Sequence, residues 1–234
     1  MIRIAESAEA LYARCVGSPF GCQILSAAEA YGLDRPFAQF WMDATAAYGK
    51  MDGVMRIAGT VEDREEARAF LGAVGAEAVL CSAEKAEKLG LTVTQRGAVL
   101  VKERAESSSQ PLETVSLREM YTVLHACEMV GEFEPFYLDL SHRVRHGTAR
   151  CTALYDGEIM AATAAAVLGK GENLLTAVAV LPQYREQGLG KAVVQQMERQ
   201  LSGRLWVLRA EKENERFYAS LGYTPGGVWC AGKL

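Results

Sequence analysis

The hydrophobic pattern of the C-terminal half alternates between strand-like and helix-like segments. Residues 174–181 form a nearly continuous apolar run with β-branched members, which is typical of a strand buried on both faces. Pro182 ends this strand, because proline has no N–H to donate to a ladder. From Leu189 onward, apolar residues recur at helical spacing, so we predict a helix that begins close to Gly188. Residues 205–208 predict a further short strand.

The segments before residue 174 predict two helices and a hairpin. Residues 116–130 carry apolar residues in a helical pattern with Ser116 as the N-cap, and residues 133–146 predict a short second helix and its exit. The apolar runs 149–155 and 159–168 enclose Asp156-Gly157, a pair that favours hairpin turns. The C-terminal half should therefore run as helices, hairpin, long strand, helix, strand, helix and final strand.

The N-terminal half shows a fainter version of the same order. Residues 44–50 and 54–60 flank the turn Met51-Asp52-Gly53, and they are followed by a predicted helix at 62–74, strand at 78–81, helix at 83–89 and strand near 92–102. Two interpretations stay open, a degenerate copy of the C-terminal half or an unrelated α/β domain with a similar hairpin. The polar, serine-rich segment 103–112 is the best linker. We therefore expect an N-terminal α/β domain over residues 1–105 and a second domain over residues 106–234.

Composition narrows the classes of function. The chain has 234 residues, a net charge of −4 and a pI near 5.6. This charge argues against non-specific electrostatic binding to nucleic acid or anionic membranes. Its six cysteines form no Cys-x-x-Cys pair and only three histidines are present, so we expect reduced thiols and no metal site. The N-terminus lacks the apolar core of a signal peptide and no apolar run approaches the ~20 residues of a membrane span. A cytoplasmic protein is expected.

The turn between the strand at 174–181 and the following helix has the features of an anion-binding site. The first N–H groups of a helix have no partner within it and suit a phosphate. Gly188 and Gly190 lack Cβ atoms, so the backbone can turn sharply and an anion can approach closely, while Arg185 and Lys191 add positive charge. The alternative is a tight glycine turn beside a surface arginine. Agreement among the strand, Pro182, the arginine and the helix favours the anion site.

Two motifs in this region resemble a known family. Residues 185–190, Arg-Glu-Gln-Gly-Leu-Gly, preceded by Val-x-Pro, are similar to the Arg/Gln-x-x-Gly-x-Gly/Ala signature of the GCN5-related N-acetyltransferases (GNAT). Residues 214–223 resemble that family's Asn-x-x-Ala-x-x-Phe-Tyr-x-x-Leu-Gly-Phe segment, although the small residue between the asparagine and Phe-Tyr is not obvious here. The resemblance covers roughly residues 149–234. It implies an α/β (α+β) fold with a mixed, mostly antiparallel sheet flanked by helices.

The resemblance also implies a cofactor and a reaction. An acetyl or other acyl group would pass from coenzyme A to a primary amine by direct attack, with acetyl-coenzyme A as co-substrate and no metal. Backbone groups of residues 178–180 would pair with the pantetheine arm, and the amides of residues 187–191 would hold the pyrophosphate. Asn214 would contact the cofactor and could also cap a helix. The implied cofactor-binding residues are Val178, Val180, Arg185, Gln187, Gly188, Leu189, Gly190, Lys191 and Asn214.

The N-terminal half offers no second anion-binding site. At the corresponding place, residues 64–68 contain no glycine and put acidic residues where phosphate would lie. If this half is a GNAT-like copy, it is a degenerate one without a cofactor site, so one cofactor per chain is expected.

Tyr218 is the candidate general acid implied by the second motif. A phenol with a pKa near its usual value of ~10 can return a proton to a leaving thiolate. The alternative is a core aromatic residue beside Phe217. His142 is the possible base, and Asp139 and His146 are possible acceptor-binding residues, because residues 137–146 are unusually rich in titratable side chains. That segment could equally be a solvated helix face. Weaker alternatives are Glu158 or Glu172 as base, a chain of waters, and an acyl-enzyme on Cys151, for which inert packing is the competing interpretation.

Other classes of function remain open at this point. A non-catalytic sensor of coenzyme A and an interaction module built on the N-terminal half are the two alternatives to an enzyme. The acceptor could be a polyamine, an aminoglycoside, an amino acid, or a protein N-terminus or lysine, because one fold hosts many acceptors. The acidic net charge mildly suits a cationic amine. Nucleic-acid and membrane partners are not expected.

Overall fold

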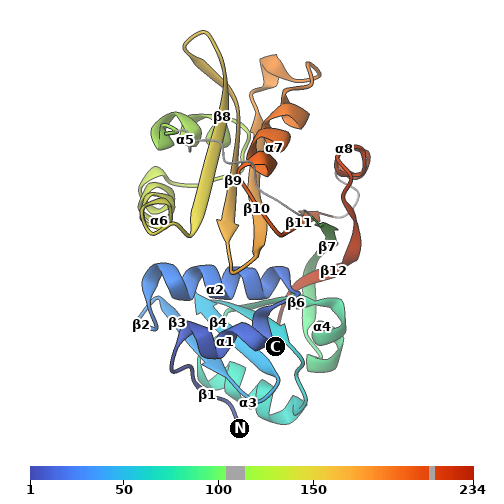
Figure 1. The fold of residues 1–234 in the computed structure, drawn as a ribbon. Coiled ribbons are helices and arrows are strands. Elements are labelled where there is room, and N and C mark those ends of the chain that lie inside the picture. Colours follow the sequence, from blue (N-terminus) through green and yellow to red (C-terminus); the bar gives the residue numbers. More distant parts are fainter. Residues whose placement is uncertain (104–113, 211–213) are drawn as a thin grey trace.

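A computed structural model describes residues 1–103, 114–210 and 214–234 (Figure 1). One long mixed sheet organises the fold, with strands in the order β1-β3-β4-β5-β6-β12-β7-β11-β10-β9-β8 and β2 paired with β3. Neighbouring strands are antiparallel except for the parallel pairs β5–β6 and β10–β11. This is the mostly antiparallel, helix-flanked α/β sheet that the family resemblance predicts.

The two halves of the chain repeat one order of elements: two helices, three antiparallel strands, a helix, a parallel strand, a helix and a last strand. The first half contains β1 (Arg3–Ile4), α1 (Ala8–Cys15), α2 (Pro19–Tyr31), β2 (Asp34–Arg35), β3 (Ala38–Met42), β4 (Ala46–Met51), β5 (Val54–Gly59), α3 (Arg64–Ala73), β6 (Ala78–Ser82), α4 (Ala83–Leu89) and β7 (Thr92–Lys102). The second contains α5 (Leu117–Ala126), α6 (Phe133–Arg145), β8 (Ala149–Asp156), β9 (Ile159–Leu168), β10 (Glu172–Val180), the 3₁₀ turn η1 (Pro182–Tyr184), α7 (Leu189–Arg199), β11 (Arg204–Ala210), α8 (Glu215–Ser220) and β12 (Thr224–Lys233).

The halves exchange their last strands. β7 of the first half pairs with β11 of the second, and β12 of the second pairs with β6 of the first, so β7 and β12 lie side by side at the centre of the sheet. The sheet is therefore continuous across the expected boundary at residues 105 and 106. The structure supports the degenerate-copy interpretation of the first half, while the division into domains at that boundary stays a prediction.

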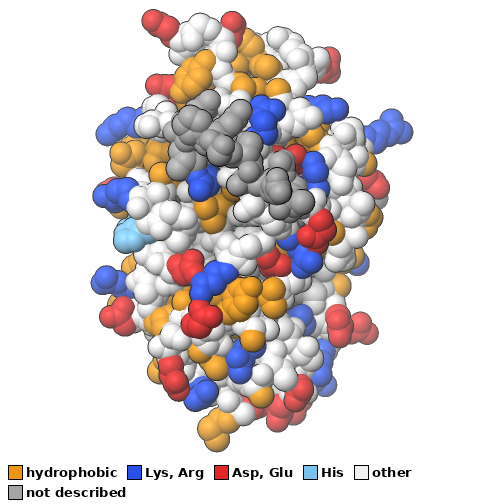
Figure 2. Space-filling view, in the orientation of Figure 1, with side chains coloured by type: hydrophobic (Ala, Val, Ile, Leu, Met, Phe, Trp, Pro, Cys, Tyr) orange, Lys and Arg blue, Asp and Glu red, His pale blue; other side chains and the backbone are white. Residues whose placement is uncertain are grey.

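Helices cover both faces of the second half's sheet. α5 and α6 pack on one face, where Met120, Leu124 and Leu140 meet alternate residues of β8 and β9. α7 packs on the other face, where Val193, Val194 and Met197 meet Ala162, Ala164 and Ala166 of β9. α2 lies across the junction of the two halves (Figure 1). On the face in Figure 2, acidic and basic side chains are interspersed.

Most predicted elements form close to their expected bounds. Ser116 caps α5, since its hydroxyl accepts from the Glu119 N–H at 3.3 Å, but the helix ends at Ala126 and not at residue 130. α6 is a single helix of 13 residues and not the short helix expected within 133–146. The predicted linker lies outside the described residues apart from Glu103. α1 and α2 were not predicted. Most residues of α2 are buried, because the helix packs against strands of both halves, so its sequence lacks an amphipathic pattern.

Candidate active site

β10 and β11 separate halfway along their length. Their parallel pairing covers only Glu172–Leu175 against Arg204–Val207, and on the other edge of β10 the register with β9 shifts between Leu175 and Ala177. This bulge leaves Thr176 unpaired and exposed. Beyond it, residues 175–178 and 207–210 line a gap of about 160 Å³ between the two strands. A strand edge facing such a gap can pair with an extended ligand.

The backbone alternation decides which groups of β10 face this gap. The Leu181 N–H donates to Ala161 O on β9 at 2.9 Å, so the N–H and C=O groups of Ala179 also turn toward β9. Those of Val178 and Val180 turn toward the gap. The Val180 carbonyl already accepts from Arg185 Nε at 3.3 Å and Cys127 Sγ at 3.4 Å. Val178 therefore offers the backbone groups best placed to pair with a ligand.

The loop after β10 turns sharply into α7. Glu186 and Gly188 take left-handed backbone conformations, with φ of 63° and 80°. Gly188 occupies the N-cap position of α7 without a side-chain cap, and the Ala192 N–H donates to its carbonyl at 3.1 Å. No hydrogen bond of the described residues uses the amides of residues 187–191. These amides are open to an anion, as the sequence predicts.

The first half closes its corresponding helix with its own carboxylate. Asp63 caps α3, because its Oδ1 accepts from the Glu66 N–H at 2.9 Å. A carboxylate there fills the place that a phosphate would take and repels other anions. Of these two corresponding helices, α7 therefore has an open start and α3 does not.

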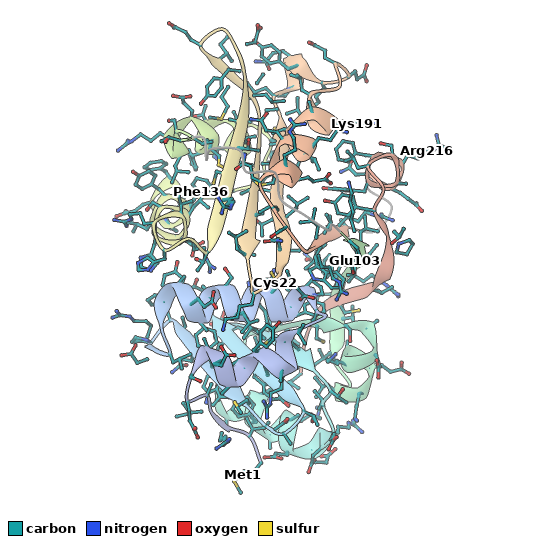
Figure 3. All side chains as sticks on the ribbon, in the orientation of Figure 1. Met1, Cys22, Glu103, Phe136, Lys191 and Arg216 are labelled. Carbon is teal, nitrogen blue, oxygen red and sulfur yellow. The ribbon has the colours of Figure 1, made fainter. Side chains whose placement is uncertain are left out.

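Arg185 and Lys191 add charge to this open helix start. Both are exposed and line a hollow of about 780 Å³, which extends from the loop to α8. No carboxylate of the described residues lies within 4 Å of either cation. Figure 3 shows Lys191 on α7 and Arg216 on α8 on the same side of the molecule. The hollow combines free amides and unpaired cations, the two features that bind phosphate groups.

Gly188 and Gly190 differ in what a side chain would do. A Cβ at Gly188 meets no atom within 4 Å, but φ of +80° is strained for any L-residue by about 1–2 kcal/mol. A Cβ at Gly190 makes ordinary contacts with Phe217 at 3.4 Å and Val180 at 3.6 Å. We therefore expect Gly188→Ala to raise the Kd for acetyl-coenzyme A by roughly 5- to 30-fold. Calorimetry measures this, and Gly72→Ala on α3 is the matched control, because a Cβ there meets no atom within 4 Å and the residue lies outside the hollow, so the change should stay below about twofold. Equal effects of the two changes would contradict this role of Gly188.

Tyr218 on α8 lies between the hollow and the gap, and it lines both. Its side chain is 8% exposed and packs edge-on against Phe217 and Tyr223. Its hydroxyl makes no hydrogen bond with the described residues. Burial raises the pKa of Tyr218 above its usual value, so the hydroxyl stays protonated through the neutral range.

Asn214 precedes α8 in a left-handed conformation with φ of 53° and lines the same two spaces as Tyr218. Its side chain does not cap α8. The helix-capping alternative for this residue is therefore wrong, and its amide is left facing the hollow and the gap.

A third space lies between the two halves of the chain. This acceptor cleft, as we name it, has a volume of about 420 Å³ and is walled by α5, α6 and β10 of the second half and by α2, β4 and β5 of the first. Met129 lines the cleft, the gap and the hollow, and Thr176 and Ala177 are shared by the cleft and the gap. The three spaces therefore adjoin one another between the α7 loop and the junction of the halves, and together they are called the passage.

The polar segment of α6 lies only partly in the acceptor cleft. Asp139 lines it and accepts hydrogen bonds from Arg143 Nε at 2.8 Å and from the Tyr31 hydroxyl. His142 does not line it: its Nε2 is 2.7 Å from Ala30 O, and its ring stacks on Tyr31. His146 is exposed and packs against the His142 ring. The structure brings Asp139 to the cleft and places both histidines at the contact between α6 and α2.

The weaker candidates lie away from the passage. Glu158 is exposed in the turn between β8 and β9. Glu172 is buried at the start of β10, where it accepts from the Gly17 N–H at 2.9 Å and pairs with Arg204 at 3.1 Å. Burial raises the pKa of Cys151 to about 12, so its thiol is inert packing at neutral pH. Across the residues described, no cluster of three or more His, Cys, Asp or Glu could hold a metal, and no helix is long and apolar enough to cross a membrane.

The residues that the first half contributes to the cleft were not predicted from the sequence. Gln23 on α2 and Arg56 on β5 line it, together with Met129 from the loop between α5 and α6. The one signal in the sequence for Arg56 was an arginine among the apolar residues of a predicted strand. No pattern in the sequence marks Met129 or Gln23, because only the docking of the halves brings them to the site.

Comparison with known proteins agrees with this geometry. A family model described as an acetyltransferase (GNAT) domain matches residues 147–225, in the second half of the chain. A sequence search finds no match among curated proteins.

Solved structures match nearly the whole chain. A GCN5-related N-acetyltransferase from Kribbella flavida has a TM-score of 0.63 and 16% identity over 99% of this chain and 96% of that one. A GNAT-family acetyltransferase from Colwellia psychrerythraea has a TM-score of 0.55 and 13% identity, with both chains covered completely. A tandem GNAT protein from the clavulanic acid biosynthesis pathway has a TM-score of 0.55 and 12% identity over 99% and 97%. At these identities the likeness concerns the fold, which is a double GNAT-like one.

Proposed function

We propose that this protein is an acyl-coenzyme A-dependent N-acyltransferase that transfers the acetyl group of acetyl-coenzyme A to a primary amine. The observation that supports this most is that the hollow, the gap and the acceptor cleft adjoin one another through shared residues. One end has free amides and unpaired cations for a pyrophosphate, the middle has the free edge of β10, and the other end is a small-molecule cleft. A passage with two different ends suits a reaction between two substrates better than the binding of one.

The residues of the passage take distinct roles in this proposal. The amides of residues 187–191, with Arg185 and Lys191, hold the pyrophosphate, and Val178 pairs with the extended pantetheine arm. Asn214 contacts the same ligand from α8. Acetyl-coenzyme A supplies the activated thioester, and the acceptor amine attacks it directly at the junction near Thr176 and Ala177. Bringing the two reactants together at this junction is itself a large part of the rate enhancement.

In this proposal the amine forms a C–N bond with the thioester carbonyl carbon, the C–S bond breaks, and Tyr218 donates a proton to the leaving sulfur. The proton lost by the amine passes to water, from which Tyr218 is reprotonated. Its hydroxyl has no described partner to compete for the proton, and its raised pKa keeps it protonated at neutral pH. Asp139 is the titratable residue of α6 that reaches the acceptor cleft, so it contacts the acceptor side. His142 and His146 position α6 against α2 and have no part in the proposed chemistry.

A screen of amines tests the proposal. Release of free coenzyme A from acetyl-coenzyme A is followed with a thiol reagent in the presence of polyamines, amino acids, aminoglycosides and peptides. We expect release above the background hydrolysis with at least one class, together with the acetylated amine by mass spectrometry. Tight binding of acetyl-coenzyme A without release for any amine would favour a non-catalytic sensor instead.

A further inference from the structure

Arg56 is a cation without an anionic partner inside the acceptor cleft. It lies on β5, its Nε donates to Gln23 Oε1 at 2.8 Å, and its Nη1 makes a longer contact of 3.4 Å with Val54 O. No carboxylate of the described residues lies within 4 Å of the guanidinium. Asp52 lines the same cleft but remains outside that distance. A largely desolvated guanidinium held only by neutral groups is costly, and an anion in the cleft would offset the cost.

The neighbouring residues favour the binding of an anion to Arg56. The second arginine of the cleft, Arg143, is 7% exposed and already engaged by Asp139, Ser26 and the Met51 sulfur. Burial is the largest cause that lowers the pKa of Arg56, followed by the positive charge of Arg143, while Asp52 and Asp139 act in the opposite direction. Asp139 accepts from Arg143 and from Tyr31, both through Oδ1, and neither Asp52 nor Asp139 forms a hydrogen bond or an ion pair with Arg56. The guanidinium of Arg56 therefore has no described carboxylate in direct contact.

The opposite wall of the cleft is apolar. It consists of Met120, Leu124, Met129, Val130, Phe136 and Leu140, from α5, α6 and the loop between them. Figure 3 shows Phe136 on the α6 side of the sheet, across from Lys191 on the α7 side. A cleft of about 420 Å³ with one cationic and one apolar wall suits a small amphiphilic molecule.

We infer that the acceptor is a small amino carboxylate with an apolar body, such as an apolar α-amino acid, whose carboxylate binds Arg56. The planar guanidinium fork matches a carboxylate with two parallel hydrogen bonds, whereas a polyamine would meet an unpaired positive charge. The inference rests on the proposed N-acyltransferase function and names its acceptor class. It also assigns a role in acceptor binding to the first half of the chain. That half supplies Gln23 and Arg56 to the acceptor cleft, although its helix α3 has no open start. The mild preference for a cationic amine suggested by net charge is thereby reversed.

Three probes separate the carboxylate from the rest of the acceptor. L-leucine carries amine, apolar side chain and carboxylate, L-leucinamide lacks the negative charge, and 3-methylbutylamine lacks the carboxylate altogether. We expect kcat/KM for leucine to exceed that for leucinamide by roughly 10-fold or more, as expected for a charge-assisted pair. The amine of leucinamide has the lower pKa, so a larger fraction of it is unprotonated at neutral pH, and a preference for leucine cannot come from amine protonation. Equal or better turnover of leucinamide or the simple amine would overturn the inference.

Variants assign the preference to Arg56. Arg56→Gln should lower kcat/KM for leucine by roughly 10-fold or more and leave that for leucinamide within about twofold. Arg56→Lys keeps the charge but not the fork, and should retain part of the preference for leucine. Arg145→Gln is the matched control, an exposed arginine on α6 outside the cleft, and should change neither substrate. An equal loss for both substrates in Arg56→Gln would contradict recognition of the carboxylate by this residue.

A binding measurement keeps the inference separate from the proposed function. Calorimetry with coenzyme A present should detect leucine and not leucinamide, whether or not acetyl transfer occurs. If no amine of any class is acetylated, the proposed function fails, and the leucine titration still decides the ligand class of the cleft. If other amines are acetylated while leucine neither binds nor reacts, the proposed function stands and the inference about Arg56 fails. Because the wild-type chain is used, a variant that does not fold cannot obscure this outcome.

Discussion

Replacing Tyr218 with phenylalanine should lower kcat by about 10²-fold or more while the Kd for acetyl-coenzyme A changes by less than about twofold. Phenylalanine keeps the ring that packs against Phe217 and Tyr223, so the change removes only the hydroxyl. That hydroxyl makes no hydrogen bond with the described residues, so no other group loses a partner in the variant. Steady-state kinetics and calorimetry on the same preparation measure the two quantities.

The pH profile supplies a second readout for Tyr218. The active form is the protonated phenol, and burial raises its pKa above the usual value near 10, so the hydroxyl is lost at a higher pH than in free tyrosine. We therefore expect no marked fall of kcat between pH 7 and about 9 that can be assigned to Tyr218. A normal rate in Tyr218→Phe would remove this residue from the mechanism. A loss of acetyl-coenzyme A binding equal to the loss of rate would make its role a structural one.

Replacing Lys102 with methionine should destabilise the fold by about 3 kcal/mol. Lys102 at the end of β7 pairs with Glu198 on α7 at 2.8 Å and donates to Leu221 O at 2.7 Å. The Glu198 side chain is only 4% exposed, so the variant leaves a buried carboxylate without its lysine. Since α7 carries the open helix start, this ion pair fixes the strand that crosses between the halves to the helix that forms the cofactor site.

Thermal unfolding measures this effect. In a chain of this length each kcal/mol corresponds to roughly 2–4 °C, so Tm should fall by about 6–12 °C. Lys170→Met removes an exposed lysine from its pair with Glu9 and is the matched control, with Tm unchanged within error. Equal Tm values for wild type and Lys102→Met would show that the pair contributes nothing to the stability of the junction.

The sequence predicts the cofactor side of this site better than the acceptor side, for a physical reason. The anion-binding site is local in sequence. It consists of the strand β10, Pro182, the left-handed Gly188 and the first turn of α7, which follow one another along the chain, so their pattern is visible in a short stretch of sequence. The acceptor cleft is assembled from α2, β4, β5, α5, α6 and β10. Arg56 and Asp139 are far apart in the sequence, and no sequence pattern indicates that both line one cleft.

The exchange of last strands was equally hidden. The repeat of elements could be predicted from the turns at Asp52-Gly53 and Asp156-Gly157, which both form tight hairpin connections. Nothing in the patterns of residues 92–102 and 224–233 specifies that each strand pairs with the other half. His142 illustrates the same limit, because its titratable ring suggested a base, whereas the fold turns it toward Ala30 and Tyr31.

Titration of acetyl-coenzyme A into the wild-type protein tests the central claim most directly. The account predicts binding of one molecule per chain, since α7 has an open helix start and α3 is closed by Asp63. Acetylpantetheine, which lacks the pyrophosphate, should bind much more weakly, and added salt should weaken binding of the full molecule. Absence of binding, two molecules per chain, or equal affinity for acetylpantetheine would contradict the assignment of residues 185–191 as the pyrophosphate site.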